Sequence, residues 1–392
     1  MNDVLYMAWR YLVYYKVKTT ILIASITLIV FLPIGLNVVV SQSAASLTTR
    51  ANATPLIIGA KGSPLELVLN SLYFESSTPE SITFGESTRV FESELAIAIP
   101  LYTPFGARDH PIVGTTIDYF HFRNLTIADG RQIALLGECV VGAKAARALE
   151  VRPGDFIVSS PESVFDLAGI YPLKMRIVGV LAPCENADDH AIFVDVKTTW
   201  VIKGLAHGHE DLSKPEAASQ VLSKTAGKVV ANASVVQYNE ITPANIDAFH
   251  FHGDPSTFPI TAVIAVPRDD KSATLLQGHY LGEGEQVQIV KPITVMDELL
   301  LTVLTVQNYV ITAVVLVSIS TLATMALVFM LSWRARRREF ETIHKIGGAK
   351  GRVLAIVASE IIVVLAMGVG FAAVLTGLTA IYGSEIIRLI IS

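Results

Sequence analysis

Histidine and carboxylate side chains form the pattern in this sequence that is best suited to binding chemistry. Two His-x-His pairs, His207 with His209 and His250 with His252, are each followed by carboxylates. Imidazole and carboxylate together suit Zn²⁺. A solvated polar loop that binds metal only adventitiously is the alternative, because the sequence does not show that the two pairs meet in space. The candidate zinc ligands are His190, His207, His209, Glu210, Asp211, His250 and His252.

The sequence does not indicate nucleophilic catalysis, because no Ser/His/Asp or Cys/His arrangement can be recognised in it. The two cysteines, Cys139 and Cys184, are too few for a disulfide scaffold or a four-cysteine metal site. They could form one disulfide in an oxidising compartment or remain thiols in the core. We therefore expect a non-catalytic protein with no directly bound cofactor apart from the zinc ion considered above.

The composition indicates a membrane protein. Of the 392 residues, 52% are hydrophobic and 17% are charged, whereas about a quarter of an ordinary soluble domain is charged. A disordered chain is excluded, because such chains are rich in charge and poor in apolar residues. Nucleic-acid binding is not expected, since a formal net charge of −5 provides no basic face.

Three apolar stretches are long enough to cross a bilayer, which requires about 20 helical residues. They cover residues 19–41, 309–333 and 353–382, and the last contains one charged residue, Glu360. The first is too long for the apolar core of a cleavable signal peptide, and no small-residue cleavage site follows it closely. Residues 294–308 are expected to continue into the second span as one helix. A degenerate fourth span within the last stretch remains an open alternative.

Basic residues set the orientation of the spans, because cytoplasmic flanks carry an excess of Lys and Arg. Residues 1–18 are predicted to form a cytoplasmic amphipathic helix, and residues 334–352 a cytoplasmic loop. Residues 42–308 then lie outside the cytoplasm, as does the tail, residues 383–392. The basic residues that set this orientation are Arg10, Lys16 and Lys18 in the first flank, and Arg334, Arg336, Arg337, Arg338, Lys345, Lys350 and Arg352 in the loop.

The extracytoplasmic part has the pattern of a mixed α/β domain. Strands are predicted at residues 95–102, 175–181 and 260–267, and a short helix at 143–149. A further helix is expected at 216–228 from its content of Ala, Glu, Gln and Lys. A break near 203–215, rich in Gly, His and acidic residues, leaves a division into two lobes open.

The cytoplasmic loop has the most specific sequence in the chain: Arg336-Arg-Arg-Glu-Phe-Glu-Thr-Ile-His-Lys-Ile-Gly-Gly-Ala-Lys-Gly-Arg-Val353. It closely resembles the loop of MacB/FtsX-type (type VII) ABC transporter permeases. In these permeases arginines and a glutamate precede apolar positions, a glycine-alanine turn and basic residues. Arg338 and Glu339 match the start of this pattern and Gly347 matches the glycine, while Gly348 stands where alanine is usual.

Two further segments carry the same resemblance. Residues 139–158, which contain a Gly-Asp turn near their end, are similar to the periplasmic core segment of the family. Residues 175–181 are similar to the strand that follows it. Glu360 matches a glutamate that is common early in the next span. The resemblance therefore covers the C-terminal membrane part and the middle of the chain.

The three apolar stretches predict a membrane protein of three transmembrane α-helices, with a large mixed α/β extracytoplasmic domain inserted between the first and the second. Four-span members of the family depart from this, because their last helix returns to the cytoplasm. The resemblance adds the expected function. It implies a permease subunit in the bacterial inner membrane that forms a homodimer and binds two copies of a cytoplasmic ATPase, which holds ATP and Mg²⁺. ATP hydrolysis would be coupled to a conformational change of the periplasmic domain, that is, to mechanotransmission. The work would be export or extraction of a substrate from the membrane or periplasm, with an adaptor, lipoprotein or hydrolase as an optional periplasmic partner.

The loop and the third span supply the candidate coupling residues. Phe340 and Ile343 are expected to lie on one face of a short helix against the ATPase, with the two glycines ending that helix. For the arginines, a plain positive-inside anchor or a contact with anionic lipids is the alternative. Glu360 is expected to form a structural ion pair, with Arg352 or Arg10 as partner, or to act in gating. The expected ATPase-coupling residues are Arg336, Arg337, Arg338, Glu339, Phe340, Ile343, Gly347 and Gly348.

A second function remains open from the sequence. An FtsX-like membrane regulator would activate a periplasmic partner, such as a cell-wall hydrolase, without transporting anything. The same mechanics would serve both functions. Loss of hydrolase activation without this protein would favour the regulator, whereas substrate accumulation would favour the transporter.

Overall fold

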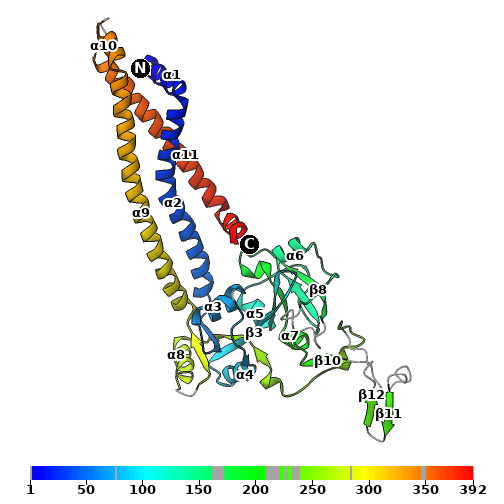
Figure 1. The fold of residues 1–392 in the computed structure, drawn as a ribbon. Helices are drawn as coiled ribbons and strands as arrows, with labels where there is room; N and C mark the ends of the chain where they lie inside the picture. Colours follow the sequence, from blue (N-terminus) through cyan, green and yellow to red (C-terminus); the bar gives the residue numbers. More distant parts are fainter. Residues whose placement is uncertain are drawn as a thin grey trace. The chain divides into compact units, whose positions relative to one another are not determined.

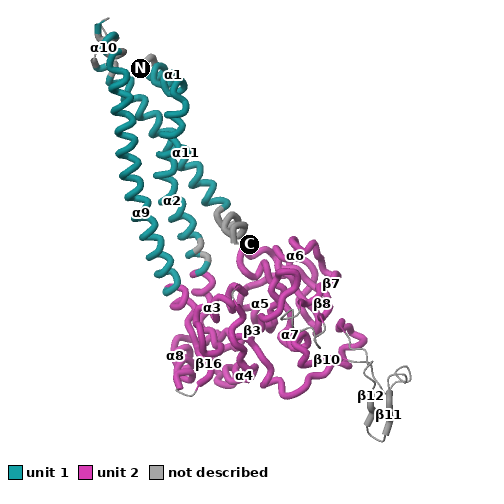
Figure 2. The backbone as a smooth tube through the Cα atoms, viewed as in Figure 1, with its two compact units in different colours: residues 1–47, 298–392 teal, residues 48–297 magenta. Residues whose placement is uncertain are grey.

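The computed structural model describes residues 2–75, 77–160, 172–208, 221–225, 228–231, 239–282, 285–345 and 350–391. The chain divides into two compact units (Figure 2). We call residues 1–47 and 298–392 the membrane unit, and residues 48–297 the extracytoplasmic unit.

Helices build the membrane unit (Figure 1). Three of them are long and apolar enough to cross a membrane, by length and composition, namely α2, α9 and residues 354–382 of α11. The three predicted spans are therefore confirmed as apolar helices, as is the continuation of residues 294–308 into the second. Within the described residues α11 runs as one helix to Ile391, and no fourth candidate span is found there. The helices are α1 (Asn2–Tyr14), α2 (Lys16–Asn52), α9 (Pro292–Ala335), α10 (Arg337–Lys345) and α11 (Lys350–Ile391).

Close packing holds the long helices together inside the membrane unit. A side-chain carbon at Gly368 of α11 would lie 2.6 Å from Ile26 of α2, so only glycine allows this approach. The hydroxyl of Thr27 donates a hydrogen bond to the Gly368 carbonyl at 3.2 Å. Small residues at helix crossings are typical of membrane proteins. The apolar cluster at this packing consists of Leu12, Leu22, Ile26, Met325 and Val364.

The orientation of the spans is a prediction that a reporter can test. Because the basic residues flank the first span on its N-terminal side and fill the loop between the second and third, we expect the C-terminus to lie outside the cytoplasm. Alkaline phosphatase fused after Ser392 should be active in cells, and a fluorescent reporter at the same place should stay dark. The reverse pattern would restore a fourth span.

A ten-stranded mixed sheet forms the framework of the extracytoplasmic unit. Its order is β16-β1-β15-β3-β4-β9-β6-β8-β5, with β7 paired to β8. The pairs β4–β9 and β6–β8 are parallel and the other pairs are antiparallel. The strands are β1 (Leu56–Ala60), β3 (Ala96–Ala107), β4 (His110–Thr115), β5 (Ile127–Gly130), β6 (Glu138–Val141), β7 (Phe156–Val158), β8 (Lys174–Leu181), β9 (Ile192–Asp195), β15 (Ala262–Pro267) and β16 (Val287–Val290).

Short helices and three small two-stranded sheets complete this unit. Side-chain caps begin α3, α7 and α8, where Ser63 accepts from the Glu66 amide, Asp195 from the Lys197 amide and Asp269 from the Ser272 amide. The helices are α3 (Pro64–Tyr73), α4 (Gly85–Glu92), α5 (Ile117–Phe122), α6 (Ala143–Leu149), α7 (Val196–Ile202), α8 (Asp270–His279) and the short η1 (Ala187–His190), η3 (Ile246–Ala248) and η4 (Pro255–Thr257). The small sheets pair β2 (Ile82–Thr83) with β14 (Pro259–Ile260), β10 (Ala206–Gly208) with β13 (Phe249–Phe251), and β11 (Val221–Thr225) with β12 (Lys228–Ala231).

Most of the secondary structure expected outside the membrane is confirmed. The three predicted strands coincide with β3, β8 and the β14–β15 region, and the helix at 143–149 is α6. The helix expected at 216–228 is wrong where the structure describes it, because residues 221–225 form β11. Val221 lies opposite Ala231 in an antiparallel pair with β12, and after an irregularity Ser223 and Lys224 lie opposite Val230 and Val229; this pairing overrides the local helix propensity. Residues 48–297 form one compact unit, and most of the proposed break near 203–215 lies outside the described residues.

Two neighbouring strands of the sheet connect directly to the two helices that enter and leave this unit. Three residues separate the end of α2 at Asn52 from the start of β1 at Leu56. One residue, Lys291, separates the end of β16 from the start of α9. Strands β1 and β16 are hydrogen-bonded to each other in antiparallel register, with Ile57 opposite Val290.

Candidate functional site

The predicted helix in the cytoplasmic loop is confirmed as α10, which follows α9 after a one-residue break at Arg336. Arg337 and Arg338 are exposed, and Arg337 forms a 3.3 Å ion pair with Glu341 one turn later. Exposed pairs of this kind contribute only about 0.3–0.5 kcal/mol, so these charges leave α10 free to bind a partner. The backbones of Glu339, Phe340 and Ile343 belong to α10, while their side chains, and all of Gly347 and Gly348, lie outside the described part.

Arg336 is turned inward, which the sequence analysis did not expect. Its Nη1 atom donates to Oε1 of Glu360 in α11 at 2.8 Å, and the two side chains are only 16% and 6% exposed. The guanidinium also lies over the ring of Tyr11 in α1, 3.9 Å from its centre. Glu360 therefore has the structural pair predicted for it, but the partner is Arg336 rather than Arg352 or Arg10. The Arg336–Glu360 ion pair therefore connects the residue between α9 and α10 to α11.

Lys18 adds a second positive charge beside this pair. Its amine hydrogen-bonds the Ser332 hydroxyl near the end of α9. It also lies 5.6 Å from the ring centres of both Tyr11 and Phe329. We call Lys18, Arg336, Glu360 and Tyr11 the hinge cluster. Lys18 was expected only to set the orientation of the first span, and no sequence signal links it to Ser332.

A buried ion pair lies inside the extracytoplasmic unit, between the last turn of α2 and η1. Arg50 binds Asp188 through two hydrogen bonds of 2.7 and 2.8 Å, and the side chains are 7% and 0% exposed. The Tyr119 hydroxyl donates to the same carboxylate at 2.7 Å and accepts from Arg50 at 2.9 Å. Burial raises the pKa of the Tyr119 phenol, so it remains a proton donor. We call Arg50, Asp188 and Tyr119 the anchor network.

The anchor network changes the interpretation of the residues around His190. Asp188 is held by Arg50, and Asp189 accepts from the amides of Cys184 and Glu185 at 2.9 and 2.8 Å. His190 ends η1, and its carbonyl lies 2.9 Å from Nδ1 of His110. It does not belong to the histidine group described next. Sequence reasoning missed Arg50 and Tyr119, which are 138 and 69 positions from Asp188.

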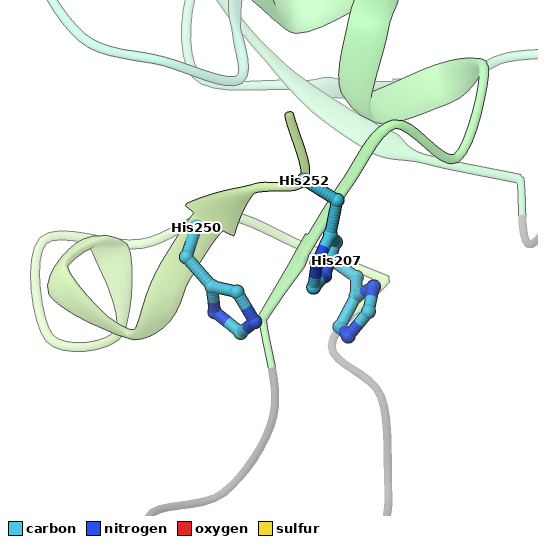
Figure 3. A group of neighbouring side chains, drawn as sticks. All are labelled: His207, His250 and His252. Atoms are coloured by element: carbon cyan, nitrogen blue, oxygen red, sulfur yellow. The ribbon is translucent and has the colours of Figure 1, made fainter. Parts of the chain in front are cut away.

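Three of the predicted metal ligands come together. His207 of β10 is directly opposite His250 of β13 in the antiparallel pair, and His252 follows two residues later. Their candidate donor atoms all lie within 4.8 Å of one another (Figure 3). His207 of the first His-x-His pair thus meets both histidines of the second pair in space. His209, Glu210 and Asp211 lie outside the described residues.

Both cysteines are free thiols, so the disulfide alternative is not realised in this structure. Cys139 is fully buried in β6. Burial, with a hydrogen bond to Asp189, raises the pKa of the Cys184 thiol to about 12. A thiol with this pKa is protonated at neutral pH and is a poor nucleophile.

Comparison with known proteins finds matches among solved structures. No protein-family model and no curated protein matches the sequence. One match is the extracellular domain of the noncanonical ABC-type transporter YknZ from Gram-positive bacteria, at 12% identity and a TM-score of 0.33, covering 60% of this chain and 98% of that one. Another is the periplasmic region of MacB from Actinobacillus actinomycetemcomitans, at 10% identity and a TM-score of 0.34, covering 66% and 97%. In these comparisons the chain is similar to one extracellular and one periplasmic domain.

Proposed function

We propose that this chain is a permease-type subunit of an ABC transporter, which passes ATP-driven movements of a separate cytoplasmic ATPase to its extracytoplasmic domain. The observation that carries the proposal is the connection of α2 and α9 to the hydrogen-bonded strands β1 and β16. Each of these helices contains residues of both units. A movement of either helix along its axis would therefore reach the same edge of the sheet.

The anchor network supports this role at the extracytoplasmic end of α2. Arg50 sits in the last turn of the helix, and its two short hydrogen bonds to Asp188 resist sliding of that turn against η1. Bidentate pairs between arginine and carboxylate are strong and fix geometry. A movement of α2 along its axis would thus be transmitted through Arg50 to η1 and the rest of the extracytoplasmic unit.

The hinge cluster and α10 support the role at the cytoplasmic end. Helix α10 carries three basic and two acidic residues in nine positions, and it begins directly after the Arg336–Glu360 pair. The resemblance of this loop to that of MacB/FtsX-type permeases implies docking on an ATPase. In this proposal two copies of the ATPase bind a homodimer of the chain, ATP and Mg²⁺ are bound by the ATPase, and the chain itself is non-catalytic.

The spans themselves favour mechanical work over ion conduction. Within residues 19–41, 309–333 and 353–382 the sequence holds one ionisable Asp, Glu, Lys, Arg or His, namely Glu360. This carboxylate is paired with Arg336. Ion and proton pathways use chains of such residues, which these spans do not offer. We place the protein in a bacterial inner membrane with its main domain in the periplasm.

The docking proposal predicts a face-specific effect on α10. Phe340→Asp places a charge on the apolar face, and burying an apolar side chain of this size is worth about 1.5–3 kcal/mol. The variant should lose its cognate ATPase on purification and lose stimulated hydrolysis in detergent. Thr342→Asp is the matched control, because it adds the same charge about 200° around the helix axis. That control should co-purify with the ATPase and hydrolyse ATP normally.

Normal co-purification and stimulated hydrolysis by Phe340→Asp would reject this face as the docking surface. Equal loss in both variants would show a general effect of negative charge on α10 instead of a docking face. The same complex separates the two candidate functions: accumulation of substrate on one side of the membrane supports transport, and activation of a periplasmic hydrolase without it supports the regulator.

A further inference from the structure

Strand pairing places three imidazoles on one face of the small sheet β10–β13. Side chains alternate between faces along a strand. Ala206 and Gly208 of β10 are buried while His207 between them is half-buried, and on β13 Phe251 packs toward the core between the exposed His250 and His252. Figure 3 shows the three histidine side chains together, one from β10 and two from the β13 segment.

Packing underneath holds this face in register. Phe251 lies edge-on to Trp200, with ring centres 6.3 Å apart, and Trp200 donates from Nε1 to the Pro259 carbonyl at 2.9 Å. A side-chain carbon at Gly208 would lie 2.6 Å from the Phe249 ring, so glycine permits the close pairing of the strands. The amide of His252 donates to the Leu205 carbonyl at 3.0 Å. The two strands are therefore positioned by the core, and the histidines project from a fixed support.

The ring geometry is close to that of a metal site. Ring centres are 5.1 Å apart for His207 and His250, 4.6 Å for His207 and His252, and 4.8 Å for His250 and His252. Donor nitrogens at about 2.0–2.1 Å from a tetrahedral zinc ion lie about 3.3 Å apart. The candidate donor atoms already lie within 4.8 Å of one another.

One ring is already oriented by a neighbouring carbonyl. Nδ1 of His250 lies 3.2 Å from the carbonyl oxygen of Ala248. In the tautomer in which Nδ1 donates this bond, Nε2 keeps its lone pair for a metal ion. Metal-binding histidines are commonly oriented by such a bond from the other ring nitrogen.

We propose that His207, His250 and His252 bind a divalent transition-metal ion, for which Zn²⁺ is the ion that fits best. Nitrogen donors of this kind suit zinc, copper and nickel and are poor ligands for Mg²⁺ or Ca²⁺. Zinc accepts three protein ligands and leaves a fourth position to water or a further ligand. Within the described residues the group consists of these three histidines.

Zinc binding would have a structural consequence, because the ion joins two strands that are otherwise held by a short ladder. A ligand that binds only the folded form stabilises a protein, and the gain grows with the logarithm of the ratio of ligand concentration to dissociation constant. The extracytoplasmic unit should therefore melt at a higher temperature when zinc is present. This inference is independent of the proposed function, since coupling to an ATPase requires no metal at this face.

The test uses the full chain, purified in detergent without a histidine tag and stripped with a chelator. Calorimetric titration with Zn²⁺ should show one ion per chain, and a thermal melt should shift upward with added Zn²⁺. His250→Ala and His252→Ala should each weaken zinc affinity by at least about 10–100-fold, the loss that even removal of an outer-shell partner produces. Because imidazole binds metal only when neutral, affinity should fall as the solution is acidified.

His121→Ala and His279→Ala are the matched controls, since both histidines are exposed on helices of the same unit. They should bind zinc as the unchanged chain does. Melting of each metal-free variant checks that the substitutions leave the fold intact, and His207→Gln gives a milder third variant. Zinc binding that is unchanged in His250→Ala, or equally weakened in His121→Ala, would overturn the proposal and leave adventitious binding only. Cu²⁺ and Ni²⁺ titrations on the same proteins would show whether the site prefers another ion.

Discussion

Replacing Asp188 with alanine is expected to lower the free energy of unfolding of the extracytoplasmic unit by about 3–5 kcal/mol. The variant leaves the Arg50 guanidinium, which is 7% exposed, as a buried charge without its carboxylate. It also removes the acceptor of the Tyr119 hydroxyl. For a body of this size a loss of this order lowers the melting temperature by on the order of 10 °C. Thermal unfolding of the full chain, followed by tryptophan fluorescence, measures this change in melting temperature.

An apolar replacement of the whole anchor network is the control. Arg50→Met, Asp188→Leu and Tyr119→Phe together remove the ion pair and the hydroxyl bound to it, so neither Arg50 nor Asp188 is left as a buried unpaired charge. We expect this triple variant to be clearly more stable than Asp188→Ala, because the cost comes from the unpaired charge. A triple variant as unstable as the single one would show instead that the packing volume dominates at this place. An Asp188→Ala protein that melts like the unchanged chain would contradict the buried pair itself.

Glu360→Gln is expected to release α10 from α11 and to reduce stimulated ATP hydrolysis strongly. The substitution removes the carboxylate with which Arg336 forms its ion pair. Arg336 and Glu360 are 16% and 6% exposed, so loss of the pair should cost on the order of 2 kcal/mol, less than for a fully buried pair. A cost of about 1.4 kcal/mol already shifts a two-state equilibrium tenfold. The measurement is the ATPase rate of the purified complex, together with the melting of the membrane unit.

Glu360→Asp keeps the charge on a shorter side chain and should retain most of the rate. The control separates charge from shape, because glutamine keeps the length of the side chain and loses the charge. If Glu360→Gln hydrolyses ATP at the normal rate and melts normally, the ion pair does not fix the hinge. If both variants fail equally, side-chain length rather than charge is what the hinge requires.

The membrane helices were predictable because their physical signal is local. In a bilayer, the backbone N–H and C=O groups of an uncharged segment such as residues 19–41 form their hydrogen bonds within a helix. In the structure this helix is longer and covers Lys16–Asn52. The ends beyond the apolar core were not predictable, since polar residues such as Gln42 carry no hydropathy signal; its side chain donates to the Ala380 carbonyl at 3.0 Å. Leu95 to Tyr102 was readable as a strand because it is a short apolar run rich in β-branched and aromatic residues.

The contacts that join distant parts of the chain were not readable. The pairing of Arg50 with Asp188 bridges 138 positions, and nothing in the local pattern distinguishes Asp188 from the neighbouring Asp189. Glu360 was correctly expected to pair with a basic residue. The identity of that residue depends on the helix break at Arg336 between α9 and α10, and no glycine or proline in the sequence marks this break. The histidines were the exception, because alternation along two strands brings His207 and His250 together once the strands are paired.

Hydrogen–deuterium exchange of the extracytoplasmic unit tests the central claim most directly. The full chain, assembled with its ATPase in lipid nanodiscs, would be compared with and without ATP and vanadate, which traps the closed ATPase. Coupling predicts that trapping changes the exchange of β1, β16 and η1 in the unchanged chain and in Thr342→Asp, since a shift in local structure alters amide protection. The Phe340→Asp protein should show no such change. Identical exchange in the trapped and free states of a complex that hydrolyses ATP would contradict transmission of movement through this chain.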